Sequence, residues 1–199
     1  MSNNIPSSNN KSEEYINGYV KRKDTTKLLQ KITDFSDSLS EIIDNKSYFS
    51  PHINTPFSHH ANKSSYMVDG PLRECISVHL IDQRLVSNNY DKFPKTLLLL
   101  DKLIKIIEPN NKIITKVYVT CLPPKKQIYI HSDTDSSYWN TISRYQFYYT
   151  GSDNIIQKID NTIYPVAPGY FYHFDHRQLH SYKNNSSDDL LLMVFDLLK

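Results

Sequence analysis

The feature that most constrains this chain is a succession of short segments rich in β-branched and aromatic residues. Proline, glycine, asparagine or serine separates them. Such residues favour strands, because their side chains pack well on a pleated sheet. Eight short strands predict a double-sheet jelly roll, in which two sheets close over one core. The segments cover residues 73–81, 112–122, 127–131, 143–151, 154–159, 170–174, 179–183 and 190–198.

Two helical patterns accompany the strands. Residues 94–107 begin with a proline in a first-turn position and end before the breaker at Pro109, which is typical of a buried helix. Residues 24–44 predict an amphipathic helix, because apolar residues recur there at spacings of four and three. We therefore expect an α+β fold that is mainly β, a cupin-like double-stranded β-helix braced by N-terminal helices. The recurring residues are Leu28, Ile32, Phe35, Leu39 and Ile42.

The chain has 199 residues, enough for one sizeable core. We expect residues 1–23 to form a disordered tail, because they contain few core-forming side chains. Residues 24–65 should form a helical extension and a connector, which Pro51 and Pro56 interrupt. Residues 66–199 should form the double-stranded β-helix domain.

Composition argues against several kinds of partner. The formal net charge is +2, and the basic residues are scattered among acids, so nothing indicates a nucleic-acid surface. The 15 tyrosines fall mostly in strand patterns, where sheet packing explains them better than base stacking. The first residues lack the apolar run of a signal peptide, and no apolar stretch could span a bilayer. Cys75 and Cys121 show no metal-binding spacing and fit a reducing compartment. We expect a cytoplasmic protein and leave its oligomeric state open.

One histidine and one aspartate suggest a metal site. His131 and Asp133 are two residues apart, so on a strand their side chains point to the same side. His180, near the end of the chain, could supply a third ligand from a neighbouring strand. Two histidines and one carboxylate leave open positions on a metal, which iron(II) oxygenases require. The alternative is a strand end that hydrogen-bonds locally, with His180 as a packed histidine.

The other histidines have simpler interpretations. His79 and Asp82 are three residues apart, which aims their side chains oppositely on a regular strand. We expect structural roles for His173 and His176. Three more histidines lie in the connector and could form a substrate lid or an incidental zinc site, although a solvated loop is the simpler interpretation. They are His52, His59 and His60.

The last part of the chain resembles the aspartyl/asparaginyl β-hydroxylase family and related free-amino-acid hydroxylases, in the order and spacing of its motifs over residues 113–199. This resemblance implies a double-stranded β-helix, iron(II), 2-oxoglutarate as cosubstrate, and hydroxylation of an amino acid. The substrate could be a small molecule or a residue of a protein. The matching positions are Pro124, His131, Arg144, Gly169, Phe174, Asp175, His180, Asn184 and Asp196.

The resemblance also implies roles for individual residues. His131 and His180 match the iron ligands, and Asp133 matches the members that keep a carboxylate there. Arg144 matches a strand arginine that contacts the cosubstrate, and a guanidinium offers the paired donors that a carboxylate prefers. Thr120 matches a hydroxyl position that can donate to the same cosubstrate.

Two departures bear on the cosubstrate. Leu190 stands where family members usually carry the arginine that binds the distal carboxylate of 2-oxoglutarate. Arg144 could take both roles, or Lys183 or Arg177 could replace the arginine, and the sequence does not decide among them. Gln146 replaces a histidine, and its amide can still hydrogen-bond.

The leading hypothesis is an iron(II)- and 2-oxoglutarate-dependent dioxygenase that hydroxylates an amino-acid residue, free or in a protein. A jelly-roll binding module that has lost catalysis is one alternative, because of Leu190. A cupin-like metalloenzyme that uses zinc or manganese without redox chemistry is another. Tyr138 and Trp139 follow the metal motif and could line a substrate pocket.

Overall fold

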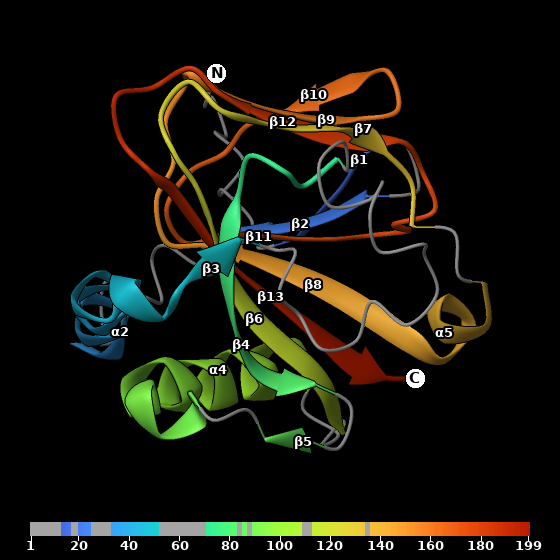
Figure 1. The fold of residues 1–199 in the computed structure, drawn as a ribbon. Coiled ribbons are helices and arrows are strands. Elements are labelled where there is room, and N and C mark those ends of the chain that lie inside the picture. The colour runs from blue at the N-terminus through green and yellow to red at the C-terminus, as the bar shows by residue number, and fades with distance from the viewer. Residues whose placement is uncertain are drawn as a thin grey trace, which may run out of the picture.

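The computed structural model describes residues 13–16, 20–24, 33–51, 71–82, 85–86, 89–108, 113–133 and 136–199. Most of the connector lies outside these residues, including its three histidines. Two β-sheets stack in the described part, and Figure 1 shows the smaller one above the larger.

The larger sheet supplies most of the framework. Its order is β1-β2-β11-β8-β13-β6-β4-β3, with β5 paired to β4, and its pairings are antiparallel. The bounds are β1 (Glu13–Ile16), β2 (Val20–Asp24), β3 (Ser50–Pro51), β4 (Ile76–Asp82), β5 (Leu85–Val86), β6 (Ile114–Leu122), β8 (Ile142–Tyr148), β11 (Tyr170–Phe174) and β13 (Leu190–Leu198).

The smaller sheet has the order β10-β9-β12-β7 and is also antiparallel. Side chains of β12 alternate, so that His180, Tyr182 and Asn184 are buried and Lys183 is exposed. The two stacked sheets confirm the expected double-stranded β-helix, a mainly β jelly roll. The bounds are β7 (Gln127–His131), β9 (Ile155–Ile159), β10 (Thr162–Tyr164) and β12 (His180–Asn184).

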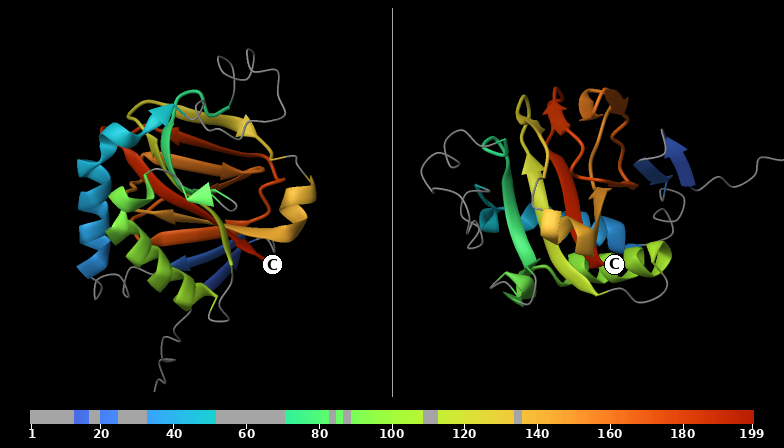
Figure 2. Two further views of the ribbon diagram at one scale, coloured as in Figure 1. Left: turned by 60° about the horizontal axis from the view of Figure 1, so that its bottom comes forward. Right: turned by 90° about the vertical axis from the view of Figure 1, so that its right-hand side faces the viewer.

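The outer face of the larger sheet is covered by two helices, α2 (Thr33–Asp44) and α4 (Pro94–Ile107), which lie side by side in Figure 2. The helix α4 begins at Pro94 and ends at Ile107, as predicted. Its first turn is capped by Glu41 of α2, whose carboxylate accepts hydrogen bonds from the backbone N–H groups of Lys95 and Thr96. A short helix, α5 (Ser136–Thr141), precedes β8. The 3-10 turns are η1 (Lys46–Tyr48) and η3 (Tyr90–Lys92).

The N-terminal expectations need two corrections. Part of the segment predicted to be a disordered tail forms β1 and β2, and β2 pairs with β11. Backbone hydrogen bonds to an otherwise open sheet edge order these residues, which a count of core side chains does not reveal. The helix predicted over residues 24–44 does not begin at Asp24, because Asp24 ends β2; its described part is α2, which begins at Thr33, and residues 25–32 lie outside the described residues.

Apolar side chains form two clusters, one on each face of the larger sheet. The cluster between the sheets includes Tyr148, Leu190 and Leu192, and the other lies beneath α2 and α4. Cys75 and Cys121 are buried free thiols. In the part of the chain that is described, no helix has the length and apolar character needed to cross a membrane.

Candidate metal centre

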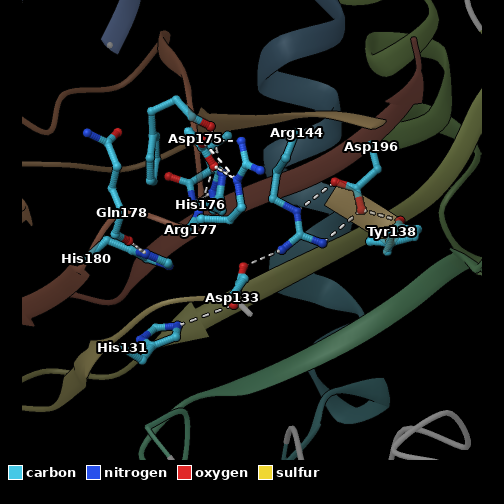
Figure 3. Close-up of polar contacts among 12 residues, drawn as sticks. His131, Asp133, Tyr138, Arg144, Asp175, His176, Arg177, Gln178, His180 and Asp196 are labelled. Carbon is cyan, nitrogen blue, oxygen red and sulfur yellow. Dashed lines mark hydrogen bonds and ion pairs between the residues drawn. The ribbon is translucent and has the colours of Figure 1, made fainter. Parts of the chain in front are cut away.

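Three potential metal ligands meet at one end of the space between the sheets (Figure 3). His131 ends β7, His180 begins β12, and the two residues are directly paired in the sheet register. Asp133 follows two residues after His131. One ligand atom from each side chain lies within 4.8 Å of the others, which is close enough to hold a single ion. Strand pairing therefore joins residues that are far apart in the sequence.

Both histidines are oriented by their backbone surroundings. Nδ1 of His131 lies 2.7 Å from the carbonyl oxygen of Tyr129, and Nδ1 of His180 lies 2.9 Å from that of Gln178. A carbonyl only accepts hydrogen bonds, so each Nδ1 carries the hydrogen. In a neutral ring with its hydrogen on Nδ1, Nε2 keeps its lone pair, which is the form of imidazole that binds a metal.

The two oxygens of Asp133 face different partners. Oδ1 lies 4.0 Å from Nε2 of His131, and Oδ2 accepts a hydrogen bond from Nη1 of Arg144 at 3.2 Å. The backbone N–H of Asp133 donates to the carbonyl of His176 at 2.8 Å. The carboxylate thus presents one oxygen on the side of the histidines.

Burial sets the charge state of two histidines near the site. Burial, as the larger cause, and the neighbouring His131 together lower the pKa of His180 to about 4. Burial also holds the pKa of His176 well below its usual value, helped by Arg144 and His180. At neutral pH both rings are uncharged, so His180 needs no deprotonation before it binds a cation.

Arg144 lies between two carboxylates. Its Nε and Nη2 donate to the two oxygens of Asp196 at 2.6 and 2.8 Å, while Nη1 donates to Asp133. The hydroxyl of Tyr138 donates to Oδ2 of Asp196 at 2.7 Å. Figure 3 shows this chain of contacts running from Tyr138 to the metal ligands.

A cavity of about 370 Å³ opens beside the three ligands. The lysine and arginine side chains among its described lining residues are Lys116 and Arg144. Lys116 is the less constrained of these two. Its Nζ lies 3.5 Å from the carboxylate of Asp82, whereas Arg144 donates hydrogen bonds to two carboxylates. Further lining residues include Pro71, Leu72, Tyr118, Thr120, Ile128, Tyr138, Gln146, His176, Tyr182, Leu192 and Val194.

One wall of the cavity carries a neutral hydrogen-bond network. The side-chain oxygen of Gln146 accepts from the hydroxyls of Tyr182 and Tyr148. Its side-chain nitrogen donates to Nε2 of His176 at 3.1 Å, whose Nδ1 donates to the carbonyl of Phe174 at 3.0 Å. The network fixes the Gln146 amide in the place where the family resemblance led us to expect a histidine.

The residues proposed to replace the missing arginine are placed differently from one another. Lys183 is exposed on β12, and the exposed Arg177 is paired with Asp175. Neither lines the cavity, whereas Arg144 does. Leu190 is fully buried in the core between the sheets. Among the described residues, the basic side chains placed to contact a ligand in this cavity are Lys116 and Arg144.

Lys116 and His176 line the cavity, although the sequence analysis gave neither of them a site role. Lys116 lies on β6 and shares a face with Tyr118 and Thr120, so strand alternation from Thr120 would have identified it. His176 was expected to have a structural role, and it also lines the cavity. Tyr138 lines the cavity as suggested, and the side chain of Trp139 lies outside the described part.

The rival pair His79 and Asp82 needs a correction. Their side chains approach each other, with Nδ1 of His79 3.9 Å from Oδ2 of Asp82. The pairing of β4 with β6 shifts register between His79 and Ile81, and this irregularity breaks the simple alternation on which the prediction rested. The ring of His79 stacks on Tyr118.

Comparison with known proteins gives one family match. A model of the family described as aspartyl/asparaginyl beta-hydroxylase matches residues 74–199. This range includes the three potential metal ligands and covers more than half of the chain. No curated protein matches the sequence.

Two solved structures with low sequence identity and TM-scores above 0.5 share the fold. The non-heme alpha ketoglutarate-dependent carbocyclase SnoK from nogalamycin biosynthesis is 10% identical and has a TM-score of 0.58. The match covers 90% of this chain and 79% of the SnoK chain. A Trichoplax adhaerens prolyl hydroxylase, bound to a peptide fragment of hypoxia inducible factor, is 15% identical, with coverages of 83% and 78% and a TM-score of 0.52. AerE from Microcystis aeruginosa is 18% identical with a TM-score of 0.34, covers 42% of this chain, and is itself matched over 36% of its length.

Proposed function

Because the chain belongs to the aspartyl/asparaginyl β-hydroxylase family, we propose that its metal centre binds iron(II) and supports a 2-oxoglutarate-dependent hydroxylation. The proposed substrate is an amino acid, either free or as a residue of a protein. The observation that carries the proposal is the convergence of His131, Asp133 and His180 beside a cavity. Two imidazoles and one carboxylate are the ligand set that non-heme iron oxygenases use, since it leaves positions for a cosubstrate and oxygen.

The donor chemistry of the site fits iron(II). The backbone contacts of His131 and His180 leave each Nε2 able to act as a ligand. The second oxygen of Asp133 is already engaged by Arg144, so the first remains for the ion. When bound, the metal and 2-oxoglutarate would together supply the oxidation, in which one atom of O2 enters the substrate and the other enters succinate as carbon dioxide leaves.

We propose Arg144 and Thr120 as cosubstrate contacts. Both line the cavity, and their guanidinium and hydroxyl groups are donors suited to a carboxylate. Lys116 adds a second cation to the same lining. With Leu190 buried in the core, we propose that these described lining residues bind the acid groups of the cosubstrate. Tyr118, Tyr138 and other lining side chains would shield the reacting groups from water.

The direct test is an anaerobic titration of the iron(II)-loaded protein with 2-oxoglutarate. We expect a visible metal-to-ligand charge-transfer band in the wild type and its loss in His180→Ala and His131→Ala. His173→Ala is the matched control, because His173 stacks on Tyr145 and does not line the cavity. Absence of the band in wild-type protein that holds iron would contradict the cosubstrate assignment.

A second candidate function is metal-dependent binding or catalysis without 2-oxoglutarate. The buried Leu190, and the engagement of Arg144 by two carboxylates, favour this alternative. It includes a binding module and a non-redox enzyme that uses zinc or manganese. Metal content after purification, together with calorimetry of 2-oxoglutarate binding to the iron(II) form, separates it from the first proposal.

We also propose a division of the chain by role. The described residues that build the centre and its cavity lie between Pro71 and Val194, within the segment 66–199. Residues 24–65 would then form an extension whose helix α2 stabilises the larger sheet from outside. The extension contributes no described residue to the cavity lining.

A further inference from the structure

The proposed metal ligand Asp133 is attached to a network of buried charges. Its Oδ2 accepts a hydrogen bond from Nη1 of Arg144, and the other edge of that guanidinium is held by Asp196. Asp196 has no exposed surface, and only 10% of the Arg144 side chain is exposed. Charges so buried persist only when they are paired, which they are here.

The fold fixes the far end of this network. Arg144 on β8 and Asp196 on β13 are directly paired in the sheet register, so the backbone sets the position of both side chains. The hydroxyl of Tyr138, from α5, donates to Oδ2 of Asp196. Burial and the nearby Asp196 raise the pKa of Tyr138, which keeps this hydroxyl protonated as a donor. Tyr138, Asp196 and Arg144 are therefore anchored independently of any metal.

We propose that Tyr138, Asp196 and Arg144 form a positioning unit that holds Asp133 as a metal ligand through one oxygen only. The inference deepens the proposed function and rests on the same metal centre. The positioning unit occupies Oδ2 of Asp133, while Oδ1 stays on the side of His131. A bound metal would then keep open the coordination position that a two-oxygen carboxylate would fill.

Hydrogen-bond partners of metal ligands act by fixing ligand orientation, and their loss typically weakens metal binding about 10- to 100-fold. Charge acts in the opposite direction here, because a guanidinium near a divalent cation repels it. A substitution that removes the charge of Arg144 would mix the two effects. The informative variants keep the charge and change only the geometry, and they are Arg144→Lys and Tyr138→Phe.

Lysine cannot reproduce the three directed bonds that Arg144 makes to two carboxylates. We expect Arg144→Lys to weaken cobalt(II) binding about tenfold or more and to change the visible ligand-field spectrum of the bound ion. Tyr138→Phe should shift both readouts in the same direction by a smaller factor. Arg177→Lys is the matched control, because Arg177 makes similar bonds to Asp175 on the surface outside the cavity lining.

A double-mutant cycle separates positioning from general destabilisation. In the Asp133→Ala background, Arg144→Lys should have no further effect on cobalt(II) affinity, because the ligand that it positions is absent. A loss of the same size in both backgrounds would overturn the inference. So would wild-type cobalt(II) affinity in both Arg144→Lys and Tyr138→Phe. If the wild type itself binds no cobalt(II), the proposed function fails together with the inference.

If Arg144→Lys does not fold, Tyr138→Phe provides the test, because it removes one hydroxyl and leaves every charge in place. In a double-mutant cycle, Tyr138→Phe should likewise have no further effect on cobalt(II) affinity in the Asp133→Ala background. Unfolding of the metal-free variants shows whether a loss of affinity merely follows a loss of stability. A change in affinity without a matching change in stability supports positioning.

Discussion

At the scale of single residues, the candidate centre includes one histidine, His180, that burial keeps neutral before a metal arrives. Backbone carbonyls fix the hydrogen on Nδ1 of His131 and His180. Burial lowers the pKa of His180 to about 4, well below its usual value. The same shift makes the stability of the metal-free protein depend on pH.

The direction of this pH dependence follows from proton binding at His180. Between the unfolded value of 6.5 and the folded value of about 4, the unfolded chain binds a proton at His180 and the folded protein does not. Stability from this residue is therefore complete above pH 6.5 and is lost as the pH falls towards 4. The shift corresponds to roughly 3 kcal/mol.

We expect the free energy of unfolding of the metal-free wild type to decrease over this pH window, measured by urea titration. His180→Gln should show a shallower decrease, because the titrating group is absent. His173→Gln, a histidine outside the cavity lining, should keep the wild-type slope. Equal slopes in His180→Gln and the wild type would contradict the assigned cause.

At the scale of elements, one carboxylate joins the two helices. Glu41 of α2 accepts hydrogen bonds from the first turn of α4, at the backbone N–H groups of Lys95 and Thr96 and the hydroxyl of Thr96. Phe93 at the cap position makes no side-chain capping bond, so Glu41 caps α4 from outside. A negative charge at a helix N-terminus also interacts favourably with the helix dipole.

Glu41→Gln should lower the free energy of unfolding by about 1 kcal/mol, because an amide accepts these bonds less well than a carboxylate and carries no charge. Asp44→Asn, at an exposed residue of the same helix, should have a smaller effect. Urea unfolding of both variants is the measurement. Metal affinity should be unchanged, since Glu41 lies outside the cavity lining. A drop in metal affinity would show that the helices act on the centre.

Strands β6 and β4 show where prediction from side-chain alternation succeeds and where it fails. The family resemblance pointed to Thr120, which lines the cavity, and alternation along β6 from Thr120 would have placed Lys116 there too. Alternation along β4 fails for His79 and Asp82 because of a register shift in the pairing with β6. A pattern that assumes a regular strand cannot reveal an irregularity imposed by the neighbouring strand.

At the scale of the whole molecule, the larger sheet has a different partner on each face. The smaller sheet and the cavity lie on one face, and α2 and α4 cover the other. Phe35 of α2 stacks on Tyr149, directly after β8, and the hydroxyl of Tyr149 lies 2.8 Å from that of Ser38. The strand that carries Arg144 is thereby braced from behind by the extension.

This arrangement predicts that α2 and the metal centre unfold together. Ile42 of α2 is fully buried, while its neighbour Ile43 on the same helix is 54% exposed. Ile42→Ala should lower the free energy of unfolding by about 2 to 5 kcal/mol, and Ile43→Ala should change it little. Far-ultraviolet circular dichroism and the spectrum of bound cobalt(II) should report the loss of structure at the same denaturant concentration. Loss of α2 while the cobalt spectrum persists would mean that the extension folds separately.

The sequence by itself determined the local elements and the family. Periodicity predicted the strands and α4, because a side chain's burial within one element depends on spacing along the chain. The motif around His131, Asp133 and His180 indicated the ligands, and the match over residues 74–199 shows the family. Only the tertiary structure decided which residues surround the proposed ligands and which strand pairs with the sheet edge. Strand register pairs His131 with His180 and Arg144 with Asp196, and the sheet edge orders β2. These contacts join residues far apart in sequence, so no local pattern contains them.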